Sequence, residues 1–74
     1  MNVNFLDTSG LRCPMPVIKM QQLVRKLASG DLVELKTTDP AAEKDIHSWC
    51  NINKHQLISI EKFDDHLIIK VQVG

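Results

Sequence analysis

The spacing of apolar residues along the chain alternates between a period of two and a period near 3.6. The first period is typical of a strand with one buried face, and the second is typical of an amphipathic helix. The pattern predicts four strands, at residues 2–7, 32–38, 55–63 and 66–73. It predicts two helices between them, at residues 14–28 and 40–53.

The side chains of each predicted strand divide between two faces. Val33, Leu35 and Thr37 point one way, opposite to Glu34 and Lys36. Val3 and Phe5 share a side of the first strand. The last two strands also alternate between apolar and polar residues. Their apolar positions are Ile58 and Ile60 in the third strand, and Leu67, Ile69, Val71 and Val73 in the fourth. Because polar residues alternate with them, we expect one sheet face to meet water and both helices to cover the other.

Each predicted helix has an apolar stripe and recognisable ends. The stripes are formed by Val17, Met20, Val24 and Leu27, and by Ala42, Ile46, Trp49 and Cys50. Gly30 is the predicted stop of the first helix. Asp39 and Pro40 predict the start of the second helix, with Asp39 as its N-cap and Pro40 as its first residue.

The element order is therefore β-α-β-α-β-β, in one domain spanning residues 1–74. We expect an α+β two-layer sandwich, with a mixed four-stranded sheet and two helices packed on one face. The first crossover makes strands one and two parallel. A hairpin at Asp64 and Asp65 joins the last two strands.

Charge adds one local feature. The formal net charge is zero, which gives no global case for binding nucleic acid or a membrane. Residues 1–30 nevertheless hold four basic side chains against the single acid Asp7, and these are Arg12, Lys19, Arg25 and Lys26. The sequence contains no secretory signal, lipidation signal or membrane-spanning run, so we expect a cytoplasmic protein.

The segment LRCPMPVIKM places Cys13 at the entrance of the first helix. Strand-to-helix loops of parallel strands meet at one edge of a sheet, so we expect Cys13 and Asp39 to share that edge. The helix end and Arg12 should favour the thiolate, since helix N-termini lower a cysteine pKa to roughly 3.5–7.5 from about 8.5. Pro14 and Pro16 remove two amide donors and leave open which of them starts the helix. Asp39 would act against Arg12 and raise the thiol pKa.

Local physics leaves two interpretations of Cys13 equally open, a reactive thiol and a small apolar residue that closes a loop. Cys50 lies on the apolar stripe of the second helix, so we expect it in the core. The alternative is a second thiol that forms a disulfide with Cys13.

Several short motifs together resemble the TusA/SirA-like sulfur-carrier family. They are Leu6-Asp7, the run Gly10-Leu11-Arg12-Cys13-Pro14-Met15-Pro16-Val17, Gly30-Asp31, Thr38-Asp39-Pro40-Ala41, Asp45-Ile46 and Trp49-Cys50. The resemblance implies the same two-layer fold. It also implies that Cys13 accepts sulfane sulfur from a persulfide donor, commonly a cysteine desulfurase, and passes it to an acceptor protein.

Carried over to this chain, Cys13 is the catalytic residue, supported by Arg12, Pro14, Pro16 and Asp39. Its cargo is a covalently bound persulfide sulfur, and no other cofactor or metal is expected. The chain would act as a covalent intermediate in sulfur transfer rather than as a stand-alone enzyme. Family members serve tRNA thiolation, cofactor maturation and related pathways. The C-terminal HLIIKVQVG lacks the basic end of the tRNA-thiolation branch.

We expect partner proteins to dock beside Cys13, at Met15, Ile18, Lys19, Arg25 and Lys26. The basic residues alone are equally consistent with a solvated helix face. Two other functions stay open: a non-catalytic adaptor that binds a partner through the basic helix, and a redox switch that uses both cysteines.

Other kinds of site have little support in the sequence. His47 and Cys50 have the spacing of metal ligands on one helix, but we expect Cys50 to face inward. Direct nucleic-acid binding is not expected either, because Phe5, Trp49 and Phe63 are all predicted to be internal. The polar outer face of the sheet favours a monomer.

Overall fold

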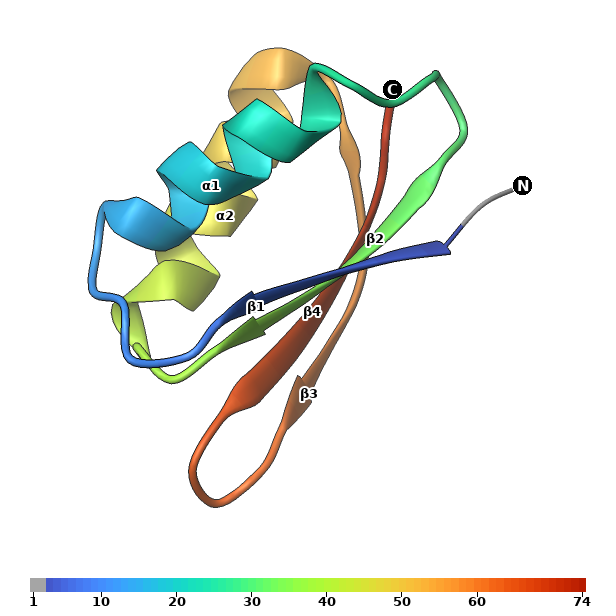
Figure 1. Cartoon of the computed structure of the whole chain (residues 1–74). Helices are drawn as coiled ribbons and strands as arrows, with labels where there is room; N and C mark the ends of the chain where they lie inside the picture. Colours follow the sequence, from blue (N-terminus) through green and yellow to red (C-terminus); the bar gives the residue numbers. More distant parts are fainter. Residues whose placement is uncertain (1–2) are drawn as a thin grey trace.

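The computed structural model describes residues 3–74, in which a four-stranded sheet is covered on one face by two helices (Figure 1). The elements in chain order are β1 (Val3–Thr8), α1 (Met15–Val24), β2 (Leu32–Thr37), α2 (Ala41–Asn53), β3 (Gln56–Lys62) and β4 (Leu67–Gln72). The β3–β4 hairpin projects beyond the helices at one end of the sheet. The predicted order and the two-layer α+β sandwich are confirmed. The predicted first residue of the first strand, Asn2, lies outside the described residues.

The strand order β1-β2-β4-β3 makes the sheet mixed. Strand β2 pairs in parallel with β1 and antiparallel with β4, which also pairs antiparallel with β3. Strands β1 and β2 therefore run in the same direction, and each leads into a helix at the same end of the sheet. This topology places the β1–α1 and β2–α2 loops side by side, as the sequence predicted.

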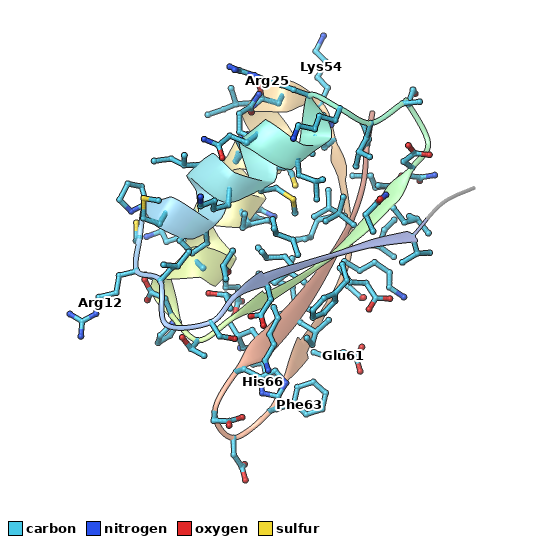
Figure 2. The ribbon with its side chains drawn as sticks, in the orientation of Figure 1. Arg12, Arg25, Lys54, Glu61, Phe63 and His66 are labelled. Carbon is cyan, nitrogen blue, oxygen red and sulfur yellow. The ribbon has the colours of Figure 1, made fainter. Side chains whose placement is uncertain are left out.

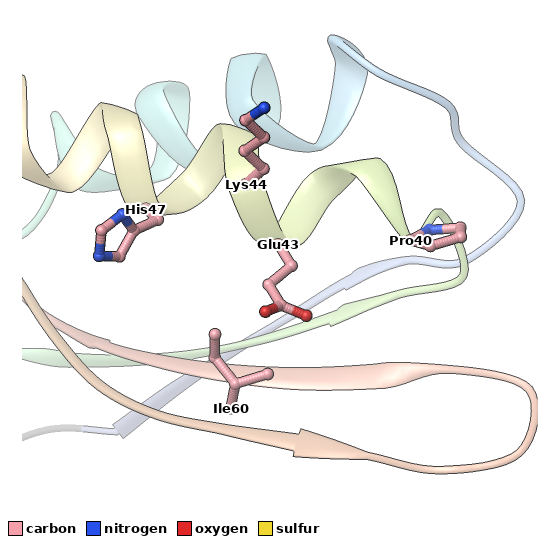
Figure 3. A pocket seen from close by; sticks show the side chains of 5 residues that line it. All are labelled: Pro40, Glu43, Lys44, His47 and Ile60. Atoms are coloured by element: carbon pink, nitrogen blue, oxygen red, sulfur yellow. The ribbon is translucent and has the colours of Figure 1, made fainter.

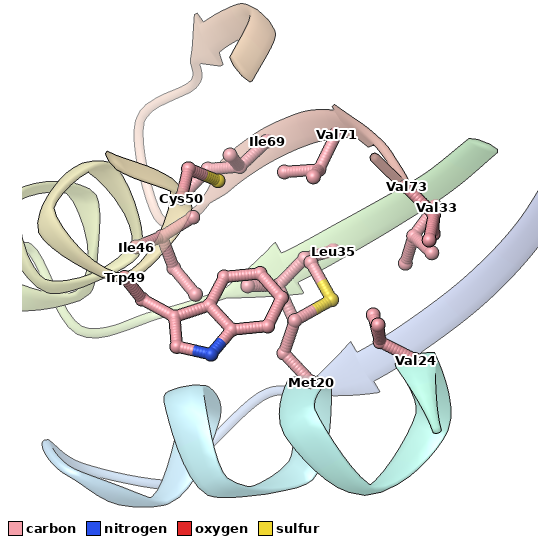
Figure 4. Close-up of a cluster of buried hydrophobic side chains, with 10 residues drawn as sticks. All are labelled: Met20, Val24, Val33, Leu35, Ile46, Trp49, Cys50, Ile69, Val71 and Val73. Carbon is pink, nitrogen blue, oxygen red and sulfur yellow. The ribbon is translucent and has the colours of Figure 1, made fainter. Parts of the chain in front are cut away.

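The core lies between the helices and the inner sheet face (Figure 4). Met20 of α1, Leu35 of β2, Ile46 of α2 and Ile69 of β4 have no exposed surface. Each buried side chain of this size contributes roughly 1.5–3 kcal/mol relative to an exposed one. The positions that the two helical stripes and strands β2 and β4 predicted to face inward therefore form the core.

Helix α1 is shorter than the sequence predicted. It ends at Val24 instead of Ala28, and Arg25 and Lys26 lie in the turn that follows. Leu27 still packs against the core from that turn. Gly30 does not stop the helix. It has φ +95°, its amide donates a hydrogen bond to the Val73 carbonyl oxygen at 2.8 Å, and it leads the chain into β2. Apolar periodicity continued past the helix because the turn packs on the same core.

Two aromatic side chains that were expected inside lie on the surface. Phe5 is 60% exposed and Phe63 is 51% exposed. The parallel register pairs Leu6 with Leu35 and Thr8 with Thr37, so the alternate residues of β1, Val3 and Phe5, face the outer side. The prediction that Phe5 and Phe63 are internal is therefore wrong. For Phe5 it failed because the face that a short edge strand buries depends on its pairing and not on its largest side chain. Phe63 lies beyond the end of β3, in the turn of the hairpin.

Strand β3 also departs from simple alternation. Its register shifts between Leu57 and Ser59, which leaves Ile58 without a paired residue on β4. Leu57 and Ile60 pack on the core, whereas Ile58 is 43% exposed. The predicted inward pair Ile58 and Ile60 is thus half wrong, because a β-bulge lets two consecutive residues oppose one partner residue.

Helix α2 ends at Asn53, in agreement with the prediction, and Lys54 then adopts a left-handed conformation with φ 61°. The Lys54 side chain projects from this end of the helix layer (Figure 2). Among residues 3–74, neither helix has the length and apolar character needed to cross a membrane.

Candidate functional site

Cys13 lies in the loop that joins β1 to α1, at the end of the sheet where β2 also leads into α2 (Figure 1). Its side chain is exposed and its thiol is free. The Gly10 amide donates to Thr38 Oγ1 at 2.8 Å, so the two loops are tied to each other. The reactive position predicted from the sequence is therefore open to solvent and held at the junction of two strand-to-helix connections.

The Asp39 carboxylate bridges these two loops. Its Oδ2 accepts the Cys13 backbone amide at 2.6 Å, and its Oδ1 accepts the Ala41 amide at 3.0 Å. Both bonds, first the one from Cys13, hold the pKa of Asp39 below its usual value, because each stabilises the ionised carboxylate. The predicted proximity of Cys13 and Asp39 is confirmed. The prediction that Asp39 is the N-cap and Pro40 the first helical residue is off by one position, since Pro40 is the N-cap and α2 begins at Ala41.

The sulfur itself faces a second carboxylate. Cys13 Sγ donates a hydrogen bond to Asp45 Oδ2 of α2. This bond is the largest cause of a raised pKa for the Cys13 thiol, followed by partial desolvation of this exposed group and by the charges of Asp45 and Asp39. A nearby negative charge favours the neutral thiol. The contact with Asp45 therefore favours the protonated form of the Cys13 thiol.

The prediction that the helix end and Arg12 lower the pKa of Cys13 is wrong. The Met15 amide donates to the Arg12 carbonyl oxygen at 2.8 Å instead of to the sulfur. The Arg12 side chain projects away from the body of the protein (Figure 2). Neither the Met15 amide nor the Arg12 side chain is therefore directed at the sulfur, whereas Asp45 accepts a hydrogen bond from it. Only the predicted effect of Asp39, which raises the pKa, is confirmed.

The structure also settles where α1 begins. The sequence left open whether the helix starts at Pro14 or Pro16, and Pro14, with φ −96° and ψ 12°, lies just before the helix. Met15 is that residue, and the buried Pro16 is the second. The Cys13–Pro14 peptide bond is cis. Cys13 is therefore two residues away from the helix proper.

A shallow groove of about 320 Å³ runs beside the sulfur between α1 and α2. We call it the thiol groove, and residues that line it include Cys13, Pro14, Val17, Asp45, Trp49 and Ile52. Ile52 is 79% exposed, the highest value among the large apolar side chains of residues 3–74. Trp49, which lines this groove, also links the two helices, since its Nε1 donates to Gln21 Oε1 at 2.7 Å. The sulfur thus borders an apolar surface that a partner protein can contact.

The residues predicted for docking are all accessible or close to it. Met15 and Ile18 are 36% and 41% exposed, and Lys19 is exposed on the same helix. Arg25 and Lys26 are exposed beyond the end of α1 and therefore do not belong to a basic helix face. Arg25 lies at the far end of α1 from Arg12 (Figure 2). Their part in docking stays a prediction.

Cys50 is 1% exposed within the core of α2 (Figure 4). Burial raises its pKa to about 11, so its thiol is protonated at neutral pH. The prediction that Cys50 packs in the core is confirmed.

His47 does not line the thiol groove. It lines a different hollow of about 380 Å³, between α2 and β3, with Pro40, Glu43, Lys44 and Ile60 (Figure 3). Across residues 3–74, no cluster of three or more His, Cys, Asp or Glu side chains has the arrangement of a metal site.

Two residues of the site were missed by the sequence analysis. Asp45 stood among the motifs that carried the family resemblance, but no role followed from its position on the second helix. Ile52 carried a weaker signal, since it is an apolar residue off the stripe of α2. Both were overlooked because the predicted elements do not specify which face of α2 borders the start of α1.

Three comparisons connect this site with known proteins. The family described as Sulfurtransferase TusA matches residues 4–73. A putative sulfur carrier protein of Aquifex aeolicus is 37% identical over 67 residues, which cover 90% of this chain and 34% of that protein. The sulfur carrier protein TusA of Pseudomonas putida is 45% identical over 53 residues, which cover 72% of this chain and 66% of that protein. The aligned part is thus about a third of the first relative and two thirds of the second.

A solved structure has the same fold. The crystal structure of a SirA-like protein from Desulfitobacterium hafniense superposes with a TM-score of 0.83 at 19% identity, and the match covers 97% of each chain. At this identity the likeness concerns the fold alone. The family match across residues 4–73, together with the fold, shows that the chain belongs to the TusA family.

Proposed function

We propose that this chain is a sulfur carrier that holds sulfane sulfur as a persulfide on Cys13. The observation that carries the proposal is the exposed Cys13 thiol, fixed by Asp39 through its backbone and bordered by the apolar thiol groove. A thiol that exchanges sulfur with other proteins must be reachable, and persulfide exchange needs one nucleophilic sulfur rather than a triad. The names of the two matched relatives, both sulfur carriers, agree with this chemistry.

The donor in this proposal is a protein persulfide, such as that of a cysteine desulfurase, and the acceptor is a second protein. The apolar residue Ile52 lines the thiol groove together with Cys13, and the apolar residues Met15 and Ile18 are exposed on α1. Lys19 adds a positive charge on α1, and Arg25 and Lys26 add two more just beyond the end of α1. Charged groups around an apolar contact speed up association and fix orientation more than they add affinity. tRNA thiolation, cofactor maturation and related sulfur pathways are the proposed destinations.

The test is sulfur loading measured by intact mass. The chain is incubated with a cysteine desulfurase and labelled cysteine, and then compared with Cys13→Ser and Cys50→Ser. We expect the mass of one labelled sulfur atom on the wild type and on Cys50→Ser, and none on Cys13→Ser. Cys50→Ser is the matched control because it removes the other thiol of the same chain. An unloaded wild type would refute the proposal.

The same experiment separates the two other functions. A redox switch would lose two hydrogens on oxidation and link Cys13 to Cys50. The burial of Cys50 in the core weighs against that bond, since its sulfur would have to leave the packing of α2. An adaptor would show neither a sulfur adduct nor a disulfide. Its Cys13→Ser variant would bind the partner protein as well as the wild type does.

A further inference from the structure

The hydrogen bond from Cys13 Sγ to Asp45 Oδ2 exists only while the sulfur carries its hydrogen. Asp45 belongs to α2, whereas Cys13 lies before α1, so the contact spans two separate elements. The charged groups around the thiol are Asp45 on α2, Asp39 on the loop before α2, and Arg12, its neighbour in sequence. Asp39 holds the backbone at 2.6 Å and Asp45 holds the side chain, so the two carboxylates fix the position of the sulfur.

Sulfur loading removes that hydrogen from Sγ. In the proposed reaction, Cys13 Sγ gives up its proton and attacks the outer sulfur of the donor persulfide. A new S–S bond forms on Sγ, the donor's S–S bond breaks, and its electron pair leaves with the donor thiolate. That thiolate takes up a proton, so Cys13–SH and donor–S–SH become Cys13–S–SH and donor–SH. The electrons balance without an external oxidant or reductant.

We propose that Asp45 is a positioning residue that distinguishes the empty carrier from the loaded one. It holds the empty Cys13 sulfur through the thiol hydrogen, and it loses this bond once Sγ is bonded to a second sulfur. The loaded half of this inference rests on the proposed sulfur-carrier function. The empty half rests on the contact alone.

After loading, charge repulsion moves the persulfide of Cys13 away from Asp45. A persulfide is a stronger acid than the corresponding thiol, so the loaded group is more readily ionised. An ionised persulfide beside Asp45 and Asp39 is repelled by two like charges, whereas the neutral thiol is attracted as a donor. The Asp45 carboxylate thus attracts the sulfur of the unloaded thiol and repels the ionised persulfide of the loaded one. This repulsion exposes the outer sulfur to an acceptor protein at the thiol groove.

The empty state is tested by alkylation with iodoacetamide over a range of pH. The wild type is compared with Asp45→Asn and with Asp64→Asn, the same exchange on the exposed β3–β4 hairpin. Only the thiolate reacts, so we expect the pH midpoint to fall in Asp45→Asn and the rate near neutral pH to rise at least about twofold. Asp64→Asn should behave as the wild type. An unchanged or higher midpoint in Asp45→Asn would overturn the proposal.

Asp45→Ser serves as a second variant, and circular dichroism checks that each variant is folded. A merely structural role of Asp45 would alter stability but not the alkylation midpoint.

The loaded state is tested with inorganic polysulfide as the sulfur source and with the carboxyl ¹³C resonance of Asp45 as the readout. Intact mass first establishes that one sulfur has been added to Cys13. We expect the Asp45 resonance to shift on loading while that of Asp64 stays in place; an Asp45 resonance identical in both states overturns the proposal.

The two tests can fail independently because alkylation needs no sulfur source. An unchanged alkylation midpoint in Asp45→Asn contradicts the Asp45 contact. A Cys13 that takes up no sulfur contradicts the sulfur-carrier function, and with it the inference about the loaded state.

Discussion

Asp39 holds Cys13 in place from a position 26 residues further along the chain, through a hydrogen bond of 2.6 Å from the Cys13 amide to Asp39 Oδ2. The other oxygen of the same carboxylate bonds to Ala41 at the start of α2. One side chain therefore connects the reactive loop to the neighbouring helix. A rotation of the carboxylate that breaks one of these hydrogen bonds also breaks the other.

Replacement of Asp39 by alanine should lower the thermal midpoint of unfolding at neutral pH. The pKa of Asp39 is lower in the folded protein than the usual value near 3.9, so its contribution is fully present above that value. The contribution is lost as the pH falls through the folded pKa. We therefore expect the difference between wild type and Asp39→Ala to shrink below pH of about 4, measured by circular dichroism melts. A difference that grows with acid would contradict this role.

The two cysteines should differ sharply in reactivity. Cys13 is exposed, whereas burial raises the pKa of Cys50 to about 11 and shields its sulfur. Iodoacetamide at neutral pH should therefore add one group to the native chain, at Cys13, and two groups after denaturation in guanidinium. Mass spectrometry of proteolytic peptides locates the adducts. Rapid labelling of Cys50 in the native protein would contradict the packing of α2 described above.

Ile46 and Ile52 provide a matched pair on one helix. Ile46 has no exposed surface, so Ile46→Ala should lower the free energy of unfolding by about 2–5 kcal/mol. Ile52 is 79% exposed, so Ile52→Ala should change it by no more than about 0.5 kcal/mol. Urea denaturation followed by circular dichroism measures both. Equal losses in the two variants would mean that α2 is rotated relative to the sheet.

Charge reversal on the proposed docking surface should slow sulfur loading without removing the thiol. For Lys19→Glu we expect the loading rate by a protein donor to fall roughly two- to tenfold at low salt. The difference should narrow as salt screens the surface charges. Lys36→Glu, on the outer face of β2, is the control and should load at the wild-type rate. Equal rates for both variants would remove Lys19 from the docking surface.

Much of the architecture followed from sequence periodicity. The inward residues of β2 and β4 were predicted correctly because both strands are paired on two sides, which enforces strict alternation. The apolar stripes of the helices were predicted correctly because each helix covers the sheet with one face. The edge strands were predicted less well. Phe5 of β1 faces outward, and Ile58 of β3 lies in a bulge, because an edge strand has one partner and its facing depends on register.

The sequence by itself determined that Cys13 precedes a helix, that Cys50 lies in the core, and that Cys13 and Asp39 share one end of a sheet. These follow from local spacing and from the direction of parallel strands. Only the tertiary structure decided that the pKa of the Cys13 thiol is raised and not lowered. That property depends on which side chain of α2 lies against the β1–α1 loop, and Asp45 reaches Cys13 there while Arg12 points into solvent. Electrostatics at a thiol is set by distances across the fold, and these are fixed only when the helices are packed.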